Sequence, residues 1–234
     1  MGATVGQDVL TPPAQQSRTG RLLQYRGGVG TSMMGNRSGP EYLSGFPLLA
    51  SECRSMAVPE NPLRRYDEAL RAALPGLLCA VGTLLFGYGM GVVFGLNEDL
   101  IKSRLSDAAA AVNATIYHGD QAAVKSVLDK SWVYMQRAHL HAGGLGASAL
   151  GLTLLVVLLQ TSLWRTRLIS LGLGAGGLGY SIFWLLAGFR APSLGSTGAA
   201  KESLAWLAIP ASGSVVIATV AVAVLVVMAI ARRR

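Results

Sequence analysis

The sequence contains four long apolar stretches, and these constrain its fold more than any other feature. They cover about residues 72–96, 140–159, 168–189 and 211–230. Each approaches or exceeds the ~20 residues that an α-helix needs to cross the hydrocarbon of a bilayer. Because lipid offers no partner for backbone N–H and C=O groups, a segment in the membrane must satisfy them internally as a helix. The sequence therefore predicts an all-α, polytopic membrane four-helix bundle.

The composition agrees with lipid as the solvent for most of the chain. Of the 234 residues, 51% are hydrophobic and only 14% are charged, whereas soluble domains carry about 25% charged residues. The formal net charge is +8, but the basic residues flank the apolar stretches rather than forming one cluster. This distribution argues against a nucleic-acid partner and indicates that the partner is the lipid bilayer.

Lys and Arg residues near the ends of membrane helices predict their orientation. Basic residues precede the first apolar stretch, separate the second from the third, and follow the fourth. These three places lie on one side of a four-helix bundle, so we expect both termini to be cytoplasmic. The high Ala, Gly and Arg content is typical of a bacterial inner membrane protein. The basic residues concerned are Arg64, Arg65, Arg71, Arg165, Arg167, Arg232, Arg233 and Arg234.

Residues 1–55 differ from the membrane domain, which we assign to residues 56–234. They are rich in Gly, Ser, Pro and Arg and have no sustained apolar period. Such a segment buries too little apolar surface to offset its chain entropy, so we expect a disordered tail. Met56 offers an alternative start of translation, in which case residues 1–55 are an extension of the gene model. An Arg-rich, acid-poor transit peptide is a third interpretation.

The segment 97–138 between the first two apolar stretches is too polar to enter lipid. Apolar residues recur at helical spacing in each of its halves. The halves are separated by the turn Tyr117-His118-Gly119-Asp120, in which Asp120 is a candidate N-cap. We expect an extracytoplasmic helical hairpin whose second arm continues into the second membrane helix. The hairpin is a candidate docking surface for a partner protein, and simple packing on the bundle is the alternative.

Small residues recur along the membrane helices at a spacing of four. One series is Gly87, Gly91 and Gly95, and another is Gly143, Ala147 and Gly151. Small residues let helix backbones approach closely, so these series predict helix packing or space for a flat cofactor. The four apolar stretches contain no Asp, Glu, Lys or Arg. This argues against a pump or a proton-coupled transporter and leaves a passive pore as a minor hypothesis.

Two of the three histidines, His139 and His141, lie where the hairpin becomes apolar. Residues two apart on a helix point to nearly opposite sides, so we expect one to face the bundle and the other the interface. His139 aligns with Gly143, which would leave space for a porphyrin, and neutral imidazole is a common axial ligand of haem iron. Arg137 is a candidate partner of a propionate. The alternative is a histidine pair that anchors the helix at the interface.

These features together resemble the styrene-oxide isomerase family, over about residues 72–230. In that family an Arg-Ala-His sequence opens the second helix, and its histidine is the axial ligand of haem b bound between the subunits of a trimer. Here Arg137-Ala138-His139 stands at that place. The resemblance therefore implies a homo-oligomer in which His139 binds the iron, with His141 as the other candidate. It also implies that ferric iron acts as a Lewis acid on an epoxide oxygen.

Other parts of the chain are similar to the family in residue types and in the order of short sequence elements. The first helix contains Thr83-Leu84-Leu85-Phe86-Gly87, and the third ends in the aromatic run Tyr180-Ser181-Ile182-Phe183-Trp184. A Gly/Pro-rich connection, Pro192–Gly198, and the element Ile209-Pro210-Ala211 follow. Within this resemblance Tyr180 lines the haem pocket.

The chain also departs from the family pattern. Leu145 stands near the position of a family Asn, and residues 173–178 offer only Gly, Ala and Leu where the family has an Asp. The family tyrosine corresponds to Tyr180, or to the positions of Phe183 or Trp184. The sequence thus favours the haem site over the isomerase reaction. One hypothesis is a haem-b protein, either an isomerase-like Lewis-acid enzyme or a sensor. The other is a cofactor-free structural or accessory subunit of a membrane complex.

Overall fold

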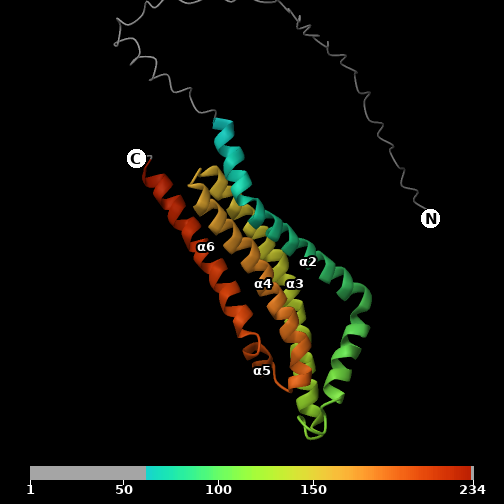
Figure 1. Ribbon diagram of the computed structural model, residues 1–234. Helices are drawn as coiled ribbons and strands as arrows, with labels where there is room; N and C mark the ends of the chain where they lie inside the picture. Colours follow the sequence, from blue (N-terminus) through green and yellow to red (C-terminus); the bar gives the residue numbers. More distant parts are fainter. Residues whose placement is uncertain (1–61, 233–234) are drawn as a thin grey trace, which may run out of the picture. The chain divides into compact units, whose positions relative to one another are not determined.

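The computed structural model describes residues 62–232, which are helical apart from short turns (Figure 1). The helices are α2 (Pro62–Ala110), α3 (Gln121–Leu158), α4 (Leu163–Leu194), α5 (Thr197–Glu202) and α6 (Ala205–Ala231). Four of them, all except α5, are long and apolar enough to cross a membrane. The predicted all-α membrane four-helix bundle is therefore confirmed, and the protein is an integral membrane protein. The predictions for residues 1–55 lie outside the described part of the chain.

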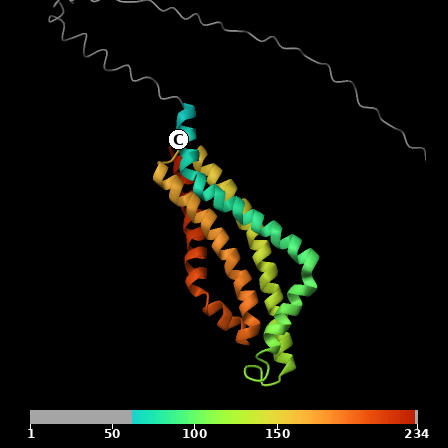
Figure 2. The ribbon, with the colours of Figure 1, turned by 45° about the vertical axis from the view of Figure 1, so that its right-hand side comes forward.

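Helix α4 is the centre of the bundle, because it packs against α2, α3 and α6. The four long helices alternate in direction. In both views the start of α2 and the end of α6 lie at one end of the bundle, and the turn between α2 and α3 lies at the other (Figures 1 and 2). We call the second end the hairpin end. The end of α2 and the start of α3 form the expected helical hairpin there.

Glycines on α4 allow close approach to each of its three neighbours. A Cβ on Gly174 would overlap the carbonyl oxygen of Gly76 in α2. A Cβ on Gly188 would lie 2.9 Å from the Ser131 carbonyl oxygen in α3, and one on Gly176 would lie 2.8 Å from a carbonyl oxygen in α6. Since lipid supplies no hydrophobic force between helices, such backbone contacts provide the packing. Of the glycine series predicted from the sequence, Gly87 packs closely on α3, whereas a Cβ on Gly95, Gly143 or Gly151 would meet no atom within 4 Å.

Helix α2 bends at Asn97, whose backbone (φ −134°, ψ 31°) is not helical. The part before Asn97 is the first membrane helix, and the part after it is the first arm of the hairpin. Figure 1 shows α2 leaning away from the other helices before the bend and returning toward α3 after it. Asp120 caps α3 as predicted, because its carboxylate accepts hydrogen bonds from Ala122 N (2.9 Å) and Ala123 N (3.0 Å). As expected, α3 then runs without a break into the membrane.

The hairpin turn packs against the end of α4. Tyr117 is buried, and its hydroxyl donates a hydrogen bond of 2.7 Å to the Pro192 carbonyl oxygen. Gly195 ends α4 with φ 66°, and a Cβ there would overlap the side chain of Ile116. A glycine is required at this position both for the left-handed backbone and for the close approach. The tip of the hairpin is therefore fixed to the bundle.

The helix ends near Pro192 and Pro210 differ from the sequence-based predictions. Helix α4 continues through Pro192 to Leu194, so the predicted connection starts later. Helix α6 begins at Ala205, which places Pro210 inside the helix rather than at its start. Pro210 has no N–H, so the carbonyl of Trp206, four residues earlier, lacks its usual helical donor.

Candidate functional site: the His139 groove

His139 projects from α3 toward α2. Its Nδ1 lies 2.8 Å from the carbonyl oxygen of Gly87. A carbonyl oxygen can only accept a hydrogen bond, so Nδ1 carries the proton and donates. In this tautomer Nε2 keeps its lone pair, and within residues 62–232 no hydrogen bond involves Nε2. The ring is therefore oriented by α2, and Nε2 is the nitrogen that could bind a ligand.

Three residues of α2 hold the imidazole ring in place. A Cβ on Gly91 would lie 3.0 Å from His139 Cε1, so the ring occupies space that only glycine leaves open. Phe94 meets the ring edge-on, with 6.3 Å between the ring centroids. Gly87, which accepts the hydrogen bond, also approaches α3 closely, because a Cβ on it would lie 3.2 Å from Gly143 N. The glycine series of α2 thus brings α2 close to the histidine.

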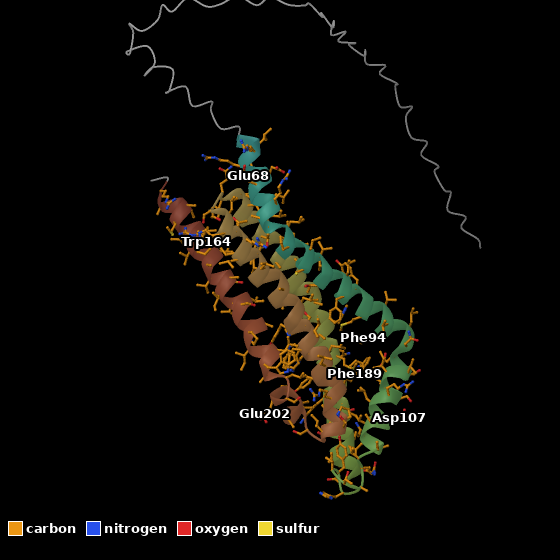
Figure 3. The ribbon with its side chains drawn as sticks, viewed as in Figure 1. Glu68, Phe94, Asp107, Trp164, Phe189 and Glu202 are labelled. Carbon is orange, nitrogen blue, oxygen red and sulfur yellow. The ribbon has the colours of Figure 1, made fainter. Side chains whose placement is uncertain are left out.

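A groove of ≈470 Å³ lies beside His139, between α2 and α3. It begins at the bend of α2, and Figure 3 shows Phe94 on the helix just before that bend. Glycine, aromatic and apolar residues form most of its wall, and the polar residues Glu98 and Gln136 lie among them. The groove is lined by Gly91, Phe94, Gly95, Glu98, Trp132, Gln136, His139 and Leu140.

The polar mouth of the groove carries a positive and a negative charge. Lys102 Nζ lies 2.5 Å from a carboxylate oxygen of Glu98 and 5.1 Å from the centroid of the Trp132 ring. The hydrogen bond to Glu98 raises the pKa of Lys102, so the ammonium group stays charged at neutral pH. Trp132 in turn packs on Phe94, with ring centroids 5.3 Å apart. Lys102 lies beside the lining residues of the groove and is paired with Glu98, so an anionic group would have to replace Glu98 as its partner.

His141 lies in a different place from His139, at the interface of α3 with α4. Its ring centroid is 5.1 Å from that of Tyr180 and 6.1 Å from that of Trp184. Arg137 lies on the same side, with its guanidinium 5.1 Å from the centroid of Trp184. Each histidine thus lies against a neighbouring helix. The expected division into a bundle-facing and an interface-facing histidine is not what the structure shows.

The structure separates the candidate residues into two groups. His139 and Gly143 lie between α3 and α2, whereas Arg137, His141 and Tyr180 lie between α3 and α4. The reason is helix geometry, since residues two apart differ in direction by about 200°. Arg137 therefore does not reach the groove beside His139. The cation near that groove is Lys102, and the sequence analysis did not select it because it lies 37 positions from His139 in the chain.

Phe94, Trp132 and Gln136 also belong to the groove and were not selected from the sequence as site residues. Trp132, Gln136 and His139 follow one another at i, i+4 and i+7, a spacing that places them on one face of a helix. This signal was available in the sequence. Phe94 gave no such signal, because its place in the groove depends on the bend of α2.

Comparison of the chain with protein-family models, with curated proteins and with solved structures finds no match in any of the three. The function is therefore argued from the geometry of the groove.

Proposed function

We propose that the protein is an integral membrane haem-binding protein in which His139 would hold the iron. The observation that carries the proposal is the hydrogen bond from His139 Nδ1 to the Gly87 carbonyl oxygen. Histidines that bind metals commonly donate their other ring N–H to a backbone carbonyl or a carboxylate, which fixes the tautomer and ring orientation. His139 has this arrangement, and it lies on the wall of a groove.

The residues of the groove suit a flat, largely apolar group. Its volume of ≈470 Å³ is within the ~300–1,000 Å³ of small-molecule and cofactor sites. A Cβ on Gly95 would meet no atom within 4 Å, so this part of the wall is open. Phe94 and Trp132 offer aromatic surface for a macrocycle. A haem needs one protein ligand on one side of the iron, and His139 alone meets that requirement.

Three polar residues at or beside the groove have a role in this proposal. His139 Nε2 would bind the iron, and Lys102 and Gln136 at the mouth would bind the propionates. Bound ferric haem would supply a Lewis acid for an oxygen atom of a small ligand, or a redox and gas-binding centre for a sensor. Phe94 and Trp132 would exclude water from that centre. The isomerase reaction, which the sequence resemblance implies, is a narrower form of this proposal.

The same proposal includes the oligomeric state of the protein, its orientation and its membrane. The groove is lined by residues of α2 and α3, and in this proposal a second copy of the chain would cover it in a homo-oligomer. The basic residues at the end opposite the hairpin, among them Arg71 and Arg167, favour that end as the cytoplasmic one. The hairpin would then be extracytoplasmic, and a bacterial inner membrane is the proposed location.

The test is the absorption spectrum of the protein, expressed with added haem precursor, purified in detergent and reduced with dithionite. We expect a Soret band and resolved α and β bands. His139→Ala should lose at least nine-tenths of the pigment per protein, because the iron loses its only protein ligand. His141→Ala, which changes the same residue type two positions away, should retain the pigment. Equal elution volumes in size-exclusion chromatography would show that both variants are folded.

Two outcomes would contradict the haem proposal. One is a folded wild-type protein that stays colourless after expression with haem precursor. The other is a pigment that His139→Ala retains in full. Either would favour the cofactor-free accessory subunit, whose docking surface would be the hairpin formed by residues 97–138.

A further inference from the structure

A second groove lies on the other side of α3, near the hairpin end of the bundle. Its volume is ≈390 Å³, and it is formed by α3 and the first residue of α5. It shares no lining residue with the groove beside His139. It is lined by Asp129, Lys130, Val133, Tyr134, Arg137 and Thr197.

This second groove carries net positive charge. Lys130 and Arg137 are seven residues apart, two turns of α3, so they project from the same side of the helix. Both are exposed, and in the part of the chain that the structure describes neither forms an ion pair. The acidic residue of the groove, Asp129, is already neutralised by Lys125 at 2.8 Å. Two cations are therefore available to an anion.

Arg137 is held in a defined position by aromatic rings. Its guanidinium carbon lies 5.5 Å from the centroid of Tyr134 and 5.1 Å from that of Trp184. Such contacts are attractive, because the face of an aromatic ring is electronegative. The guanidinium is planar, and its N–H donors match two oxygens of a phosphate or carboxylate. Arg137 is thus oriented before any ligand binds.

The depth of Arg137 in the bundle matches a lipid headgroup. Trp164 and Trp184 are 20 residues apart in α4, a rise of about 30 Å, which is the thickness of the hydrocarbon. Trp164 is 61% exposed and lies near the end opposite the hairpin (Figure 3), as expected of an interfacial aromatic residue. Arg137 packs on Trp184, so it lies where the hydrocarbon meets the headgroups on the other side.

The side of α3 that carries Arg137 has open positions at two glycines toward the membrane interior, and Ser148 lies on the same side. Gly144 and Gly151 follow Arg137 at intervals of seven residues, so they continue the same side of the helix. A Cβ on either would meet no atom within 4 Å. An acyl chain can therefore lie along this surface below a headgroup held by Arg137.

From the charge, the aromatic support and the depth, we propose that this groove binds the phosphate of a membrane phospholipid. Arg137 would bind two phosphate oxygens, and Lys130 would add a second cation on the side away from the hydrocarbon. The Thr197 hydroxyl lines the same groove and can donate a hydrogen bond. The site is independent of the haem proposal, because no residue of the His139 groove takes part.

Native mass spectrometry of the detergent-purified protein tests the proposal. The protein is titrated separately with phosphatidylglycerol, with diacylglycerol, which lacks the phosphate, and with inorganic phosphate. We expect saturable binding of phosphatidylglycerol and at least tenfold weaker binding of the other two. Arg137→Gln and Lys130→Gln should each weaken binding about fivefold, since one cation near a membrane surface contributes ~1 kcal/mol to binding an anionic lipid.

The matched control is Arg104→Gln, which removes the same charge from an exposed position on the α2 arm of the hairpin. This variant should bind phosphatidylglycerol as the wild type does. Arg137→Lys keeps the charge but loses the bidentate geometry, so it should lie between wild type and Arg137→Gln. If Arg137→Gln does not fold, Lys130→Gln decides, because Lys130 is exposed and makes no ion pair in the described region.

Three results would overturn the proposal. The first is equal lipid binding by Arg137→Gln or Lys130→Gln and by Arg104→Gln. The second is equal binding of diacylglycerol and phosphatidylglycerol, which would show that the groove does not recognise the phosphate. The third is displacement of the lipid by inorganic phosphate at equal concentration, which would assign the groove to a soluble anion.

Discussion

At the scale of single residues, the glycines of this protein differ in what surrounds them. At Gly174 the missing side chain lets two backbones touch, whereas at Gly82 a Cβ would meet no atom within 4 Å. At Gly91 the ring of His139 occupies the space where a side chain would lie. The sequence alone does not distinguish these three surroundings, because all three glycines lie in apolar helices. The distinction depends on which neighbour each residue meets.

Gly174→Ala tests the backbone contact between α4 and α2. The added Cβ would overlap the Gly76 carbonyl oxygen, which belongs to rigid backbone, so the helices must move apart. Overpacking of this kind costs about 1–3 kcal/mol. We expect a clear fall in the temperature at which the detergent-purified protein loses its folded size-exclusion peak.

The control for this change is Gly82→Ala, which makes the same substitution in α2 at an open position. It should leave the transition temperature unchanged or raise it slightly, because alanine is the better helix former. Equal loss of stability in both variants would contradict the assigned role of Gly174.

At the scale of elements, the bend of α2 and the docking of the hairpin depend on each other. The backbone of Asn97 leaves the helical conformation, and the arm that follows returns to α3. The hairpin tip is then held against α4 by the buried hydroxyl of Tyr117, which donates to Pro192. Because the groove beside His139 starts at this bend, docking of the hairpin also shapes the proposed haem site.

Tyr117→Phe tests the hairpin contact. It removes the hydrogen bond to the Pro192 carbonyl oxygen and leaves that oxygen buried without this donor, at a cost of about 1–3 kcal/mol. We expect a lower thermal transition temperature in detergent at pH 7. Tyr88→Phe is the control, because Tyr88 is 62% exposed and its hydroxyl should contribute little. Equal effects of the two changes would argue against the docked hairpin.

The same contact predicts a dependence on pH. Burial raises the pKa of Tyr117 above its ordinary value of 10.0. A group whose pKa is higher in the folded state contributes stability below the pKa of the unfolded state and loses it above. The difference in stability between the wild type and Tyr117→Phe should therefore be constant from pH 7 to 9 and shrink above about pH 10.

At the scale of the whole molecule, an even number of membrane helices places the two ends of the described chain on one side. In the orientation that we propose from the distribution of basic residues, that side would be the cytoplasmic one. The hairpin would then lie outside, and both proposed sites, which are near the hairpin end, would lie at the level of the outer leaflet. Small molecules would reach the His139 groove from that leaflet or from the external solution.

Cysteine labelling in intact cells tests this orientation. Both native cysteines, Cys53 and Cys79, are first replaced by Ser and Ala, and single cysteines are then placed at Ala114 in the hairpin turn and at Ser162 between α3 and α4. Both positions are exposed. A membrane-impermeant maleimide should label the Ala114→Cys protein in intact cells and the Ser162→Cys protein only after permeabilisation. The reverse pattern would invert the proposed orientation.

The sequence by itself determined the class of the protein, the four membrane helices and the cap at Asp120. These features depend on hydrophobicity, length and local hydrogen bonding, which neighbouring residues decide. Helix geometry also required His139 and His141 to point in different directions. Which helix lies in each direction was decided only by tertiary packing, because it depends on close contacts such as those of Gly87 and Gly174. Tertiary packing therefore placed His139 beside one groove and Arg137 in another.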